Sequence, residues 1–202
     1  MIHELTTLEI KVASNAKVYA ALQERLPSAG GTLVGAFASD IGDLSRVMLL
    51  RAFTDANAAS EAQQRLLMDR NPLGCGEWLA SLQSERFALF PFLAAPQPGA
   101  YGKWYELRTY SLRHGALAET IEAWKAALPA RHAMSPCLGV FTALDGEQPR
   151  FLNIWAYDSV DARARIRGDA VAQGLWPPQG GPANLTKMQS NLCIPLPFSP
   201  MR

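Results

Sequence analysis

The chain has 202 residues, 49% of them hydrophobic and 18% charged, with a formal net charge of +1. This composition is ordinary for one large or two small globular domains, and a net charge so near zero provides no electrostatic field for nucleic acid or an anionic membrane. No run of about 18 apolar residues that could span a bilayer occurs, and the N-terminus lacks the basic and apolar regions of a signal peptide, so we expect a cytoplasmic protein without nucleic-acid or membrane partners.

The first half of the chain contains segments that indicate alternating strands and helices. Residues 2–7 have strand character, and Gly42-Asp43 is typical of a turn between two strands. Residues 55–68 are predicted to form a helix. A stretch rich in proline and glycine, residues 95–100, has the composition of a linker.

The second half contains the same kinds of segment in the same order. Pro129 is expected to end its first helix, Asp145-Gly146 predicts a hairpin turn, and Asp158-Ser159 offers an N-cap for its second helix. The predicted elements are, in order, strand 105–112, helix 116–128, strands 137–144 and 150–157, helix 160–172 and strand 187–195.

Three blocks of sequence recur in both halves, which indicates an internal repeat. Glu4, Leu5 and Thr7 recur as Glu106, Leu107 and Thr109; Gly35 and Phe37 recur as Gly139 and Phe141; Gln83-Ser84 recurs as Gln189-Ser190. The blocks keep their order, and the offset between copies grows only slowly along the chain. The chain is therefore predicted to be two copies of one module.

Each copy reads strand, helix, strand, strand, helix, strand, which is the ferredoxin-like βαββαβ unit of the α+β class. The middle strands are apolar on both faces, so the face without helices must also be covered. The other copy's sheet is the simplest cover. We therefore expect two ferredoxin-like modules, residues 1–94 and 103–202 joined by a linker at 95–102, that pack as an intrachain pseudo-dimer into an α+β barrel; a further homo-oligomer stays open.

The second copy resembles the NIPSNAP family. The resemblance rests on YELRTY (105–110), LGVF (138–141) and WAYDS (155–159), followed by Arg163 and Arg167. The first copy is a degenerate version, with Arg51-Ala52-Phe53 in place of the family's Trp-x-Tyr and with Ala59 and Gln63 in place of the paired arginines. The resemblance implies the dimeric α+β barrel fold, which is shared with small monooxygenases, isomerases and haem-degrading enzymes, but it implies no particular reaction.

The candidate site residues lie in the second copy. Glu106, Arg108 and Tyr110 alternate along one strand and therefore share a face, which we expect to be the barrel interior. They form either an anchor for a small ligand or a structural ion pair, because a buried carboxylate needs a charged partner. On that hypothesis Glu106 and Arg108 are coupled.

Two pairs of residues extend this candidate site. Arg163 and Arg167 are four apart on a helix and share a face, where they could clamp a carboxylate or phosphate or form salt bridges. Trp155 and Tyr157 could line a pocket, although aromatic residues at such spacings also form cores.

Residues that bind metals or cofactors show no recognisable arrangement. The three cysteines are odd in number and are expected to be free thiols: Cys75, Cys137 and Cys193. The three histidines have no second ligand at a local metal spacing: His3, His114 and His132. There is also no glycine-rich phosphate loop and no nucleophile elbow. We therefore expect no metal and no cofactor, and no catalytic residue can be assigned.

Two functions remain open from the sequence. The first is a small-molecule site in the second module, between its sheet and its helices, that binds a small organic ligand or carries out cofactor-free monooxygenase-like or isomerase-like chemistry. The second is a non-enzymatic interaction or assembly module. The feature that separates them is whether Glu106, Arg108 and Tyr110 border an open pocket or a closed core.

Overall fold

The computed structural model describes all residues, Met1–Arg202, as two consecutive βαββαβ modules. The first module comprises β1 (Ile2–Ile10), α1 (Asn15–Arg25), β2 (Thr32–Ile41), β3 (Arg46–Phe53), α2 (Ala56–Met68) and β4 (Leu79–Leu89). The second comprises β5 (Trp104–Leu112), α3 (Leu117–Met134), β6 (Cys137–Ala143), β7 (Arg150–Tyr157), α4 (Val160–Ala172), the short α5 (Gly181–Asn184) and β8 (Leu185–Pro195). The repeat predicted from the sequence is therefore present in the fold.

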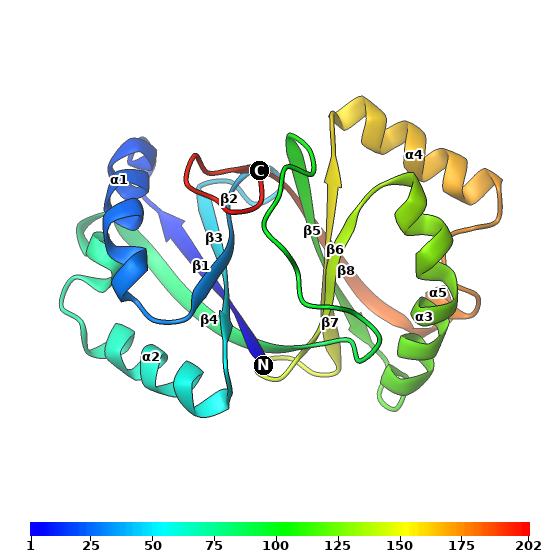
Figure 1. Ribbon diagram of the computed structural model, residues 1–202, viewed down its shortest axis with the longest axis horizontal. Helices are drawn as coiled ribbons and strands as arrows, with labels where there is room; N and C mark the ends of the chain where they lie inside the picture. The colour runs from blue at the N-terminus through cyan, green and yellow to red at the C-terminus, as the bar shows by residue number, and fades with distance from the viewer.

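The eight strands form one closed barrel in the order β1-β3-β2-β8-β5-β7-β6-β4. Two seams join the modules: β2 pairs with β8, and β4 pairs with β6, both antiparallel. The helices lie outside the strands, with α1 and α2 on one side of the barrel and α3 and α4 on the opposite side (Figure 1). The expected intrachain α+β barrel is thus confirmed, and its closure uses backbone hydrogen bonds at both seams as well as face-to-face packing.

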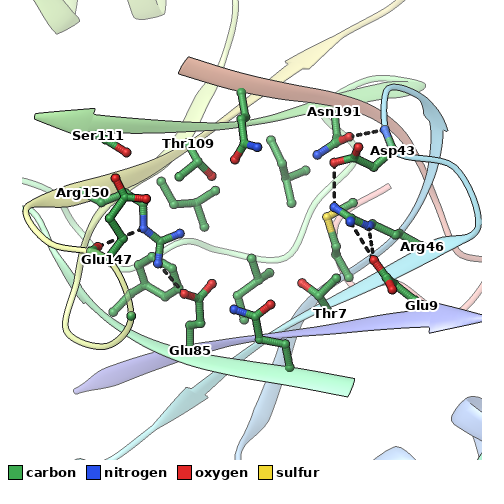
Figure 2. A pocket seen from close by; sticks show the side chains of 18 of the residues that line it. Thr7, Glu9, Asp43, Arg46, Glu85, Thr109, Ser111, Glu147, Arg150 and Asn191 are labelled. Atoms are coloured by element: carbon green, nitrogen blue, oxygen red, sulfur yellow. Dashed lines mark hydrogen bonds and ion pairs between the residues drawn. The ribbon is translucent and has the colours of Figure 1, made fainter. Parts of the chain in front are cut away.

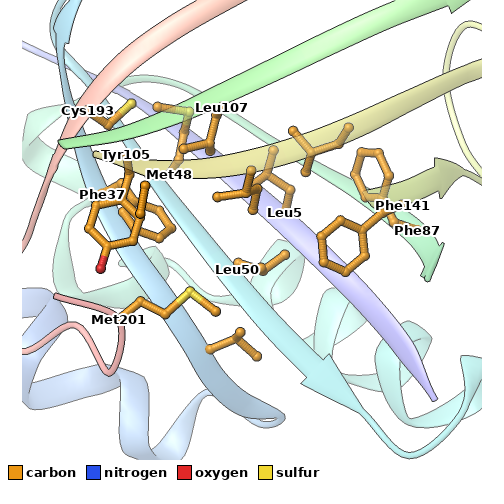
Figure 3. Close-up of a cluster of buried hydrophobic side chains, with 14 of the residues drawn as sticks. Leu5, Phe37, Met48, Leu50, Phe87, Tyr105, Leu107, Phe141, Cys193 and Met201 are labelled. Carbon is orange, nitrogen blue, oxygen red and sulfur yellow. The ribbon is translucent and has the colours of Figure 1, made fainter. Parts of the chain in front are cut away.

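Side chains of both modules fill the barrel interior (Figure 3). Because side chains alternate along a strand, every second residue points inward. The inward set forms one buried apolar cluster that includes Leu5 and Leu107, Phe37 and Phe141, and Met48 and Leu152, which are equivalent pairs from the two copies. Three further clusters lie between the sheet and the helices: one in the second module, and a larger and a smaller one in the first.

The recurring Gly-x-Phe block has a structural cause. The strand register shifts at Gly35 in β2 and at Gly139 in β6, which is a β-bulge in each case. At both bulges the ring of the following phenylalanine, Phe37 or Phe141, lies directly over the glycine, so that an added Cβ would clash with it. Each ring then packs on an aromatic ring of the other module.

These two contacts repeat each other across the barrel. Phe37 packs against Tyr105 with ring centroids 4.9 Å apart, and Phe141 packs against His3 at the same separation. His3 is 1% exposed, and burial lowers its pKa to about 4. It therefore fills the strand position that Tyr105 fills in the other copy and is neutral near pH 7.

The helix predicted to stop at Pro129 continues to Met134, so that prediction was wrong. A proline inside a helix removes one hydrogen bond and crowds the preceding turn. Here the continuation is supported by buried side chains on both sides of the proline, Leu128 and Arg131. His132, which lies beyond the predicted end of the helix at residue 128, is in the last turn of α3, where its Nδ1 accepts a hydrogen bond of 3.1 Å from the backbone N–H of Cys137.

The last residues of the chain return to the first module. The backbone N–H of Leu196 donates to Ala36, and the hydroxyl of Ser199 accepts from the N–H of Ala36 at 2.9 Å. Met201 is fully buried in the barrel cluster. All three cysteines are unpaired. None of the helices has both the length and the apolar character that crossing a membrane would require.

Candidate functional site

The predicted polar residues of β5 lie together, but on the helix side of the sheet. Tyr105 and Leu107 belong to the barrel core, so Glu106 and Arg108 point toward α3 and α4. The expectation that they face the barrel interior was wrong. Alternation determines which residues share a face, but both faces of β5 are buried, so the pattern alone could not decide which face is inside.

Glu106 is the centre of this cluster and is completely buried. Its Oε1 accepts hydrogen bonds from Arg108 Nη1 at 2.6 Å, from Arg163 Nη2 at 2.6 Å and from Ser190 Oγ at 2.7 Å. Its Oε2 has no hydrogen-bond partner and lies 3.8 Å from Arg167 Nη1. The predicted pairing of Glu106 with Arg108 is therefore present, and both helix arginines also reach this carboxylate.

These contacts determine the ionisation of Glu106. Burial alone would raise the pKa of its carboxyl group, but the hydrogen bond from Arg163 and the charge of Arg108 outweigh burial and lower the pKa to about 2. The carboxylate is thus ionised throughout the neutral range. A group with so low a pKa is a poor proton acceptor, so Glu106 is unsuited to act as a general base.

Aromatic residues surround the cluster on the same face. The guanidinium group of Arg108 donates to the hydroxyl of Tyr110 and lies 5.2 Å from the centre of its ring. Burial raises the pKa of Tyr110 despite the nearby Arg108. Trp155 packs edge-on against Trp176, and its indole N–H donates to Asn153 Oδ1 at 2.7 Å. The aromatic residues named from the sequence are therefore part of the second module's core.

Arg131 was not anticipated from the sequence, and it is 2% exposed. Its guanidinium group lies 4.4 Å from the centre of the Trp155 ring and donates to Ser135 Oγ at 2.7 Å and to the Tyr157 hydroxyl at 3.2 Å. No carboxylate lies within 4 Å of it. Arg131 continues the helical spacing of the buried residues Trp124 and Leu128. It was not predicted from the sequence because the helix was expected to end at Pro129.

The second module thus holds an excess of buried positive charge. Four arginines contribute to it: Arg108, Arg131, Arg163 and Arg167. Glu106 is the only carboxylate within ion-pair distance of any of them. The cluster is closed toward the barrel; the side chains of Arg163 and Arg167 are 21% and 35% exposed and give it its contact with solvent. None of the five main cavities is lined by the residues predicted for this site.

A cavity of about 310 Å³ opens at one end of the barrel (Figure 2). Its floor is apolar and includes Leu5, Leu107 and Leu152 from the barrel core. Its wall is polar and is built largely from equivalent residues of the two copies, such as Thr7 and Thr109, Gln83 and Gln189, and Arg46 and Arg150. The sequence repeat identified the threonine and glutamine pairs, but it gave no reason to place them around one cavity.

Ion pairs hold the two arginines of this cavity against its wall. Arg46 contacts Glu9 at 2.7 Å and Asp43 at 2.6 Å, and Arg150 contacts Glu85 across the β4–β6 seam (Figure 2). Hydrogen bonds from Ser81 and Arg46 lower the pKa of Glu9. The arginines are therefore already neutralised. No group of three or more histidine, cysteine, aspartate or glutamate side chains in the structure has a metal-binding arrangement.

Comparison with known protein families shows to which family the chain is related. The NIPSNAP family model matches residues 4–73 and 105–200, which is most of both modules. The chain belongs to the NIPSNAP family. Both copies match, so the degenerate first module is itself a NIPSNAP module. The resemblance drawn from the second module is thereby confirmed and extended to the first.

Named relatives include NipSnap homolog 2 of Mus musculus, 28% identical over 128 residues, which covers 62% of this chain and 46% of the relative. The chain therefore spans about half the length of the first curated relatives it matches. A NipSnap homolog of Dictyostelium discoideum is 24% identical over 199 residues, which covers 89% of this chain and 86% of the relative.

Solved structures with the same fold have little sequence identity to this NIPSNAP chain. A proposed monooxygenase from Lactobacillus acidophilus superposes with a TM-score of 0.70 at 9% identity and covers 96% of this chain and 93% of its own. An anthrone oxidase-like protein superposes with a TM-score of 0.66 at 12% identity and covers 98% and 93%. At this level of identity the likeness shows the shared α+β barrel fold.

Proposed function

We propose that this NIPSNAP protein binds a small organic anion in its second module, between the sheet and helices α3 and α4. The observation that carries the proposal is the charge balance, four arginines against the single carboxylate of Glu106. Arg131 supports it most, because a buried cation without an acidic partner is costly to the fold. Uncompensated buried charge of this kind is typical of a functional site.

The exposed part of the cluster suggests how the anion is received. Arg163 and Arg167 lie one turn apart on α4, and Arg167 contacts Glu106 only at 3.8 Å. Arg167 therefore has donors available for a carboxylate or phosphate group. The neighbouring ring of Tyr110 would supply apolar contact for the organic part of the ligand.

The same charge balance would support chemistry that passes through an anion. Fixed guanidinium groups in a buried setting stabilise negative charge that develops on a substrate, as in an enolate or phenolate. Cofactor-free oxygenation and isomerisation are reactions of this kind, and both are consistent with fold relatives named as monooxygenase and oxidase-like proteins. In this proposal Glu106 orients the arginines through its ion pairs. It takes no part in proton transfer, because its low pKa makes it a poor base.

A non-enzymatic interaction or assembly module is the second candidate function. The observation in its favour is that Glu106, Arg108 and Tyr110 are buried and line none of the main cavities. In that case the arginine cluster would be an ion-pair network that fixes helix α4 on the sheet.

Binding of simple aromatic anions separates the two candidates. We expect benzoate and phenyl phosphate to raise the melting temperature of the wild-type protein, and neutral benzamide to have no effect. Arg167→Gln should weaken that response by about tenfold or more, since a charge-assisted hydrogen bond is worth about 1.5–3 kcal/mol. Arg165→Gln, an exposed position on the same helix without an ion pair, is the matched control.

The contrary result is equally clear. If a panel of aromatic carboxylates and phosphates leaves the wild-type melting temperature unchanged, or if Arg167→Gln and Arg165→Gln respond alike, the anion site is refuted. The interaction module would then be the better description.

A further inference from the structure

A second concentration of arginines lies in the first module, in the cleft between α1, α2 and β3. A cavity of about 140 Å³ occupies this cleft, and three arginines line it: Arg25 from the end of α1, Arg51 from β3 and Arg65 from α2. The charged lining contains one acid, Asp69. From the sequence, any polar site was expected to be restricted to the second copy, so this cavity lies where none was anticipated.

Arg51 forms the inner wall of the cavity and is 2% exposed. One side of its guanidinium group is occupied. Nη2 donates to Glu4 at 2.5 Å, and Nη1 donates to the carbonyl groups of Ala29 and Gly30, both at 3.1 Å. Its buried Nε has no hydrogen-bond partner. The carboxylate of Glu4 therefore neutralises Arg51 from behind, and two of the five N–H groups of Arg51, one on Nε and one on Nη2, stay unpaired.

The other two arginines stand at the entrance with weak partners. The nearest acid to Arg25 is its exposed neighbour Glu24 at 3.7 Å, and the nearest acid to Arg65 is Glu61 at 4.0 Å. Asp69 makes no ion pair with any of the three, and its Oδ1 accepts from the backbone N–H of Asn71 instead. Because Glu4 already neutralises Arg51, the uncompensated positive charge at this cavity comes from Arg25 and Arg65, and a bound anion would be favoured by these two.

We propose that this cavity binds a phosphate-sized oxyanion, either free phosphate or the phosphoryl group of a small organic phosphate. Arginine donors match the geometry of phosphate oxygens, and phosphate accepts several charge-assisted hydrogen bonds at once. The volume suits such a group with one or two water molecules, since a water occupies about 30 Å³. It is too small for the drug-sized ligands that typical pockets of about 300–1,000 Å³ hold.

The site is independent of the one proposed in the second module. It uses different helices, and the residues that would contact the anion are not shared. A variant at Arg65 therefore tests the first module, and a variant at Arg167 tests the second, each in the full-length protein.

Calorimetric titration with inorganic phosphate at constant ionic strength, maintained with chloride, tests the proposal. We expect saturable binding to the wild-type protein, weakened about tenfold or more by Arg65→Gln and by Arg25→Gln, because each removes one charged donor. Both side chains are mostly exposed, at 64% and 58%, so these variants should fold. Lys103→Gln carries the same charge change at an exposed position outside both clefts and should bind as the wild type does.

A parallel titration with methyl phosphate identifies the source of the group. Equal affinities would indicate that free phosphate is recognised, and tighter methyl phosphate would indicate an organic phosphate; both support the site. The proposal is overturned if neither compound binds in excess of chloride. It is also overturned if Arg65→Gln and Lys103→Gln weaken binding equally, since that pattern would reflect only the net charge of the protein.

Discussion

Arg51 and Trp155 occupy equivalent positions in the two repeats, and each lies directly across the sheet from a buried glutamate. Arg51 faces Glu4 between β1 and β3, and Trp155 faces Glu106 between β5 and β7. In the first module the strand arginine neutralises the glutamate directly. In the second module a tryptophan stands there, and the positive charge comes from Arg108 on β5 and from helix α4. Whether arginine or tryptophan occupies this strand position therefore determines which element of each module supplies the positive charge that neutralises the buried glutamate.

Because of this difference, we expect the loss of one arginine to lower the free energy of unfolding by different amounts in the two modules. Arg51→Met leaves Glu4 buried without an ion pair, which should destabilise the protein by about 3–5 kcal/mol. Arg108→Met leaves Arg163 on Glu106, so its cost should be smaller, about 1–3 kcal/mol. Urea unfolding of both variants measures the difference, and adding Arg163→Met to Arg108→Met should cost more than the sum of the single changes. Equal costs for Arg51→Met and Arg108→Met would contradict this account.

The ion pair between Glu85 and Arg150 crosses the β4–β6 seam and should help to close the barrel. Both side chains are largely buried, at 15% and 13% exposure. A double-mutant cycle with Glu85→Gln and Arg150→Met should give a coupling energy of about 1–3 kcal/mol. The equivalent arginine Arg46 pairs with Glu9 inside one module at 31% and 42% exposure, so that cycle should give less than about 1 kcal/mol. Coupling energies in the reverse order would show that the seam pair contributes little.

The Gly-x-Phe block predicts an unusual response to alanine. Gly139→Ala places a methyl group against the ring of Phe141, which is packed on His3 and cannot move freely, so we expect a loss of about 2–4 kcal/mol. Gly168 lies inside α4 with nothing near its added methyl group, so Gly168→Ala should stabilise the protein by about 0.5–1 kcal/mol. Thermal unfolding of the two variants is the test. A neutral Gly139→Ala would mean that the bulge does not require glycine.

The lowered pKa of the buried His3 predicts that the protein loses stability at mildly acidic pH. Its pKa is about 4 in the folded protein, against an ordinary value of 6.5, so the unfolded chain takes up a proton that the folded protein does not. Stability should therefore fall by about 3 kcal/mol as the pH is lowered from 6.5 to 4. His3→Phe should remove this dependence, and His114→Gln, at an exposed position, should retain it. Urea unfolding at several pH values will show whether the slopes of wild type and His3→Phe differ, as this explanation requires.

Most of the fold could be predicted from the internal sequence repeat. Recurrence of glutamate, glycine and phenylalanine at slowly drifting offsets gave two modules, and the apolar second face of each sheet required a cover. The family resemblance named the same barrel. By contrast, the end of α3 depends on how Leu128 and Arg131 pack beyond Pro129, and such tertiary contacts override the local preference of a single proline.

The sequence predicted which residues form the candidate site, but not the face of the sheet on which they lie. Glu106, Arg108, Arg163 and Arg167 do meet, because strand alternation and helical spacing each determine a face. Which face of β5 meets the helices depends on the register of the whole barrel, which no local pattern contains. The arginine cavity of the first module brings together three segments distant in sequence, and no spacing rule connects them.

Both seams of the barrel join strands of one chain, and this has a consequence for assembly. A barrel closed between two separate chains opens on dilution, whereas closure within one chain is a unimolecular step with a fixed effective concentration. The equilibrium between open and closed barrels in this chain therefore does not depend on protein concentration. Fusion also removes the symmetry of a homodimer, so that each half can vary its buried charges while the other half maintains the shared interior.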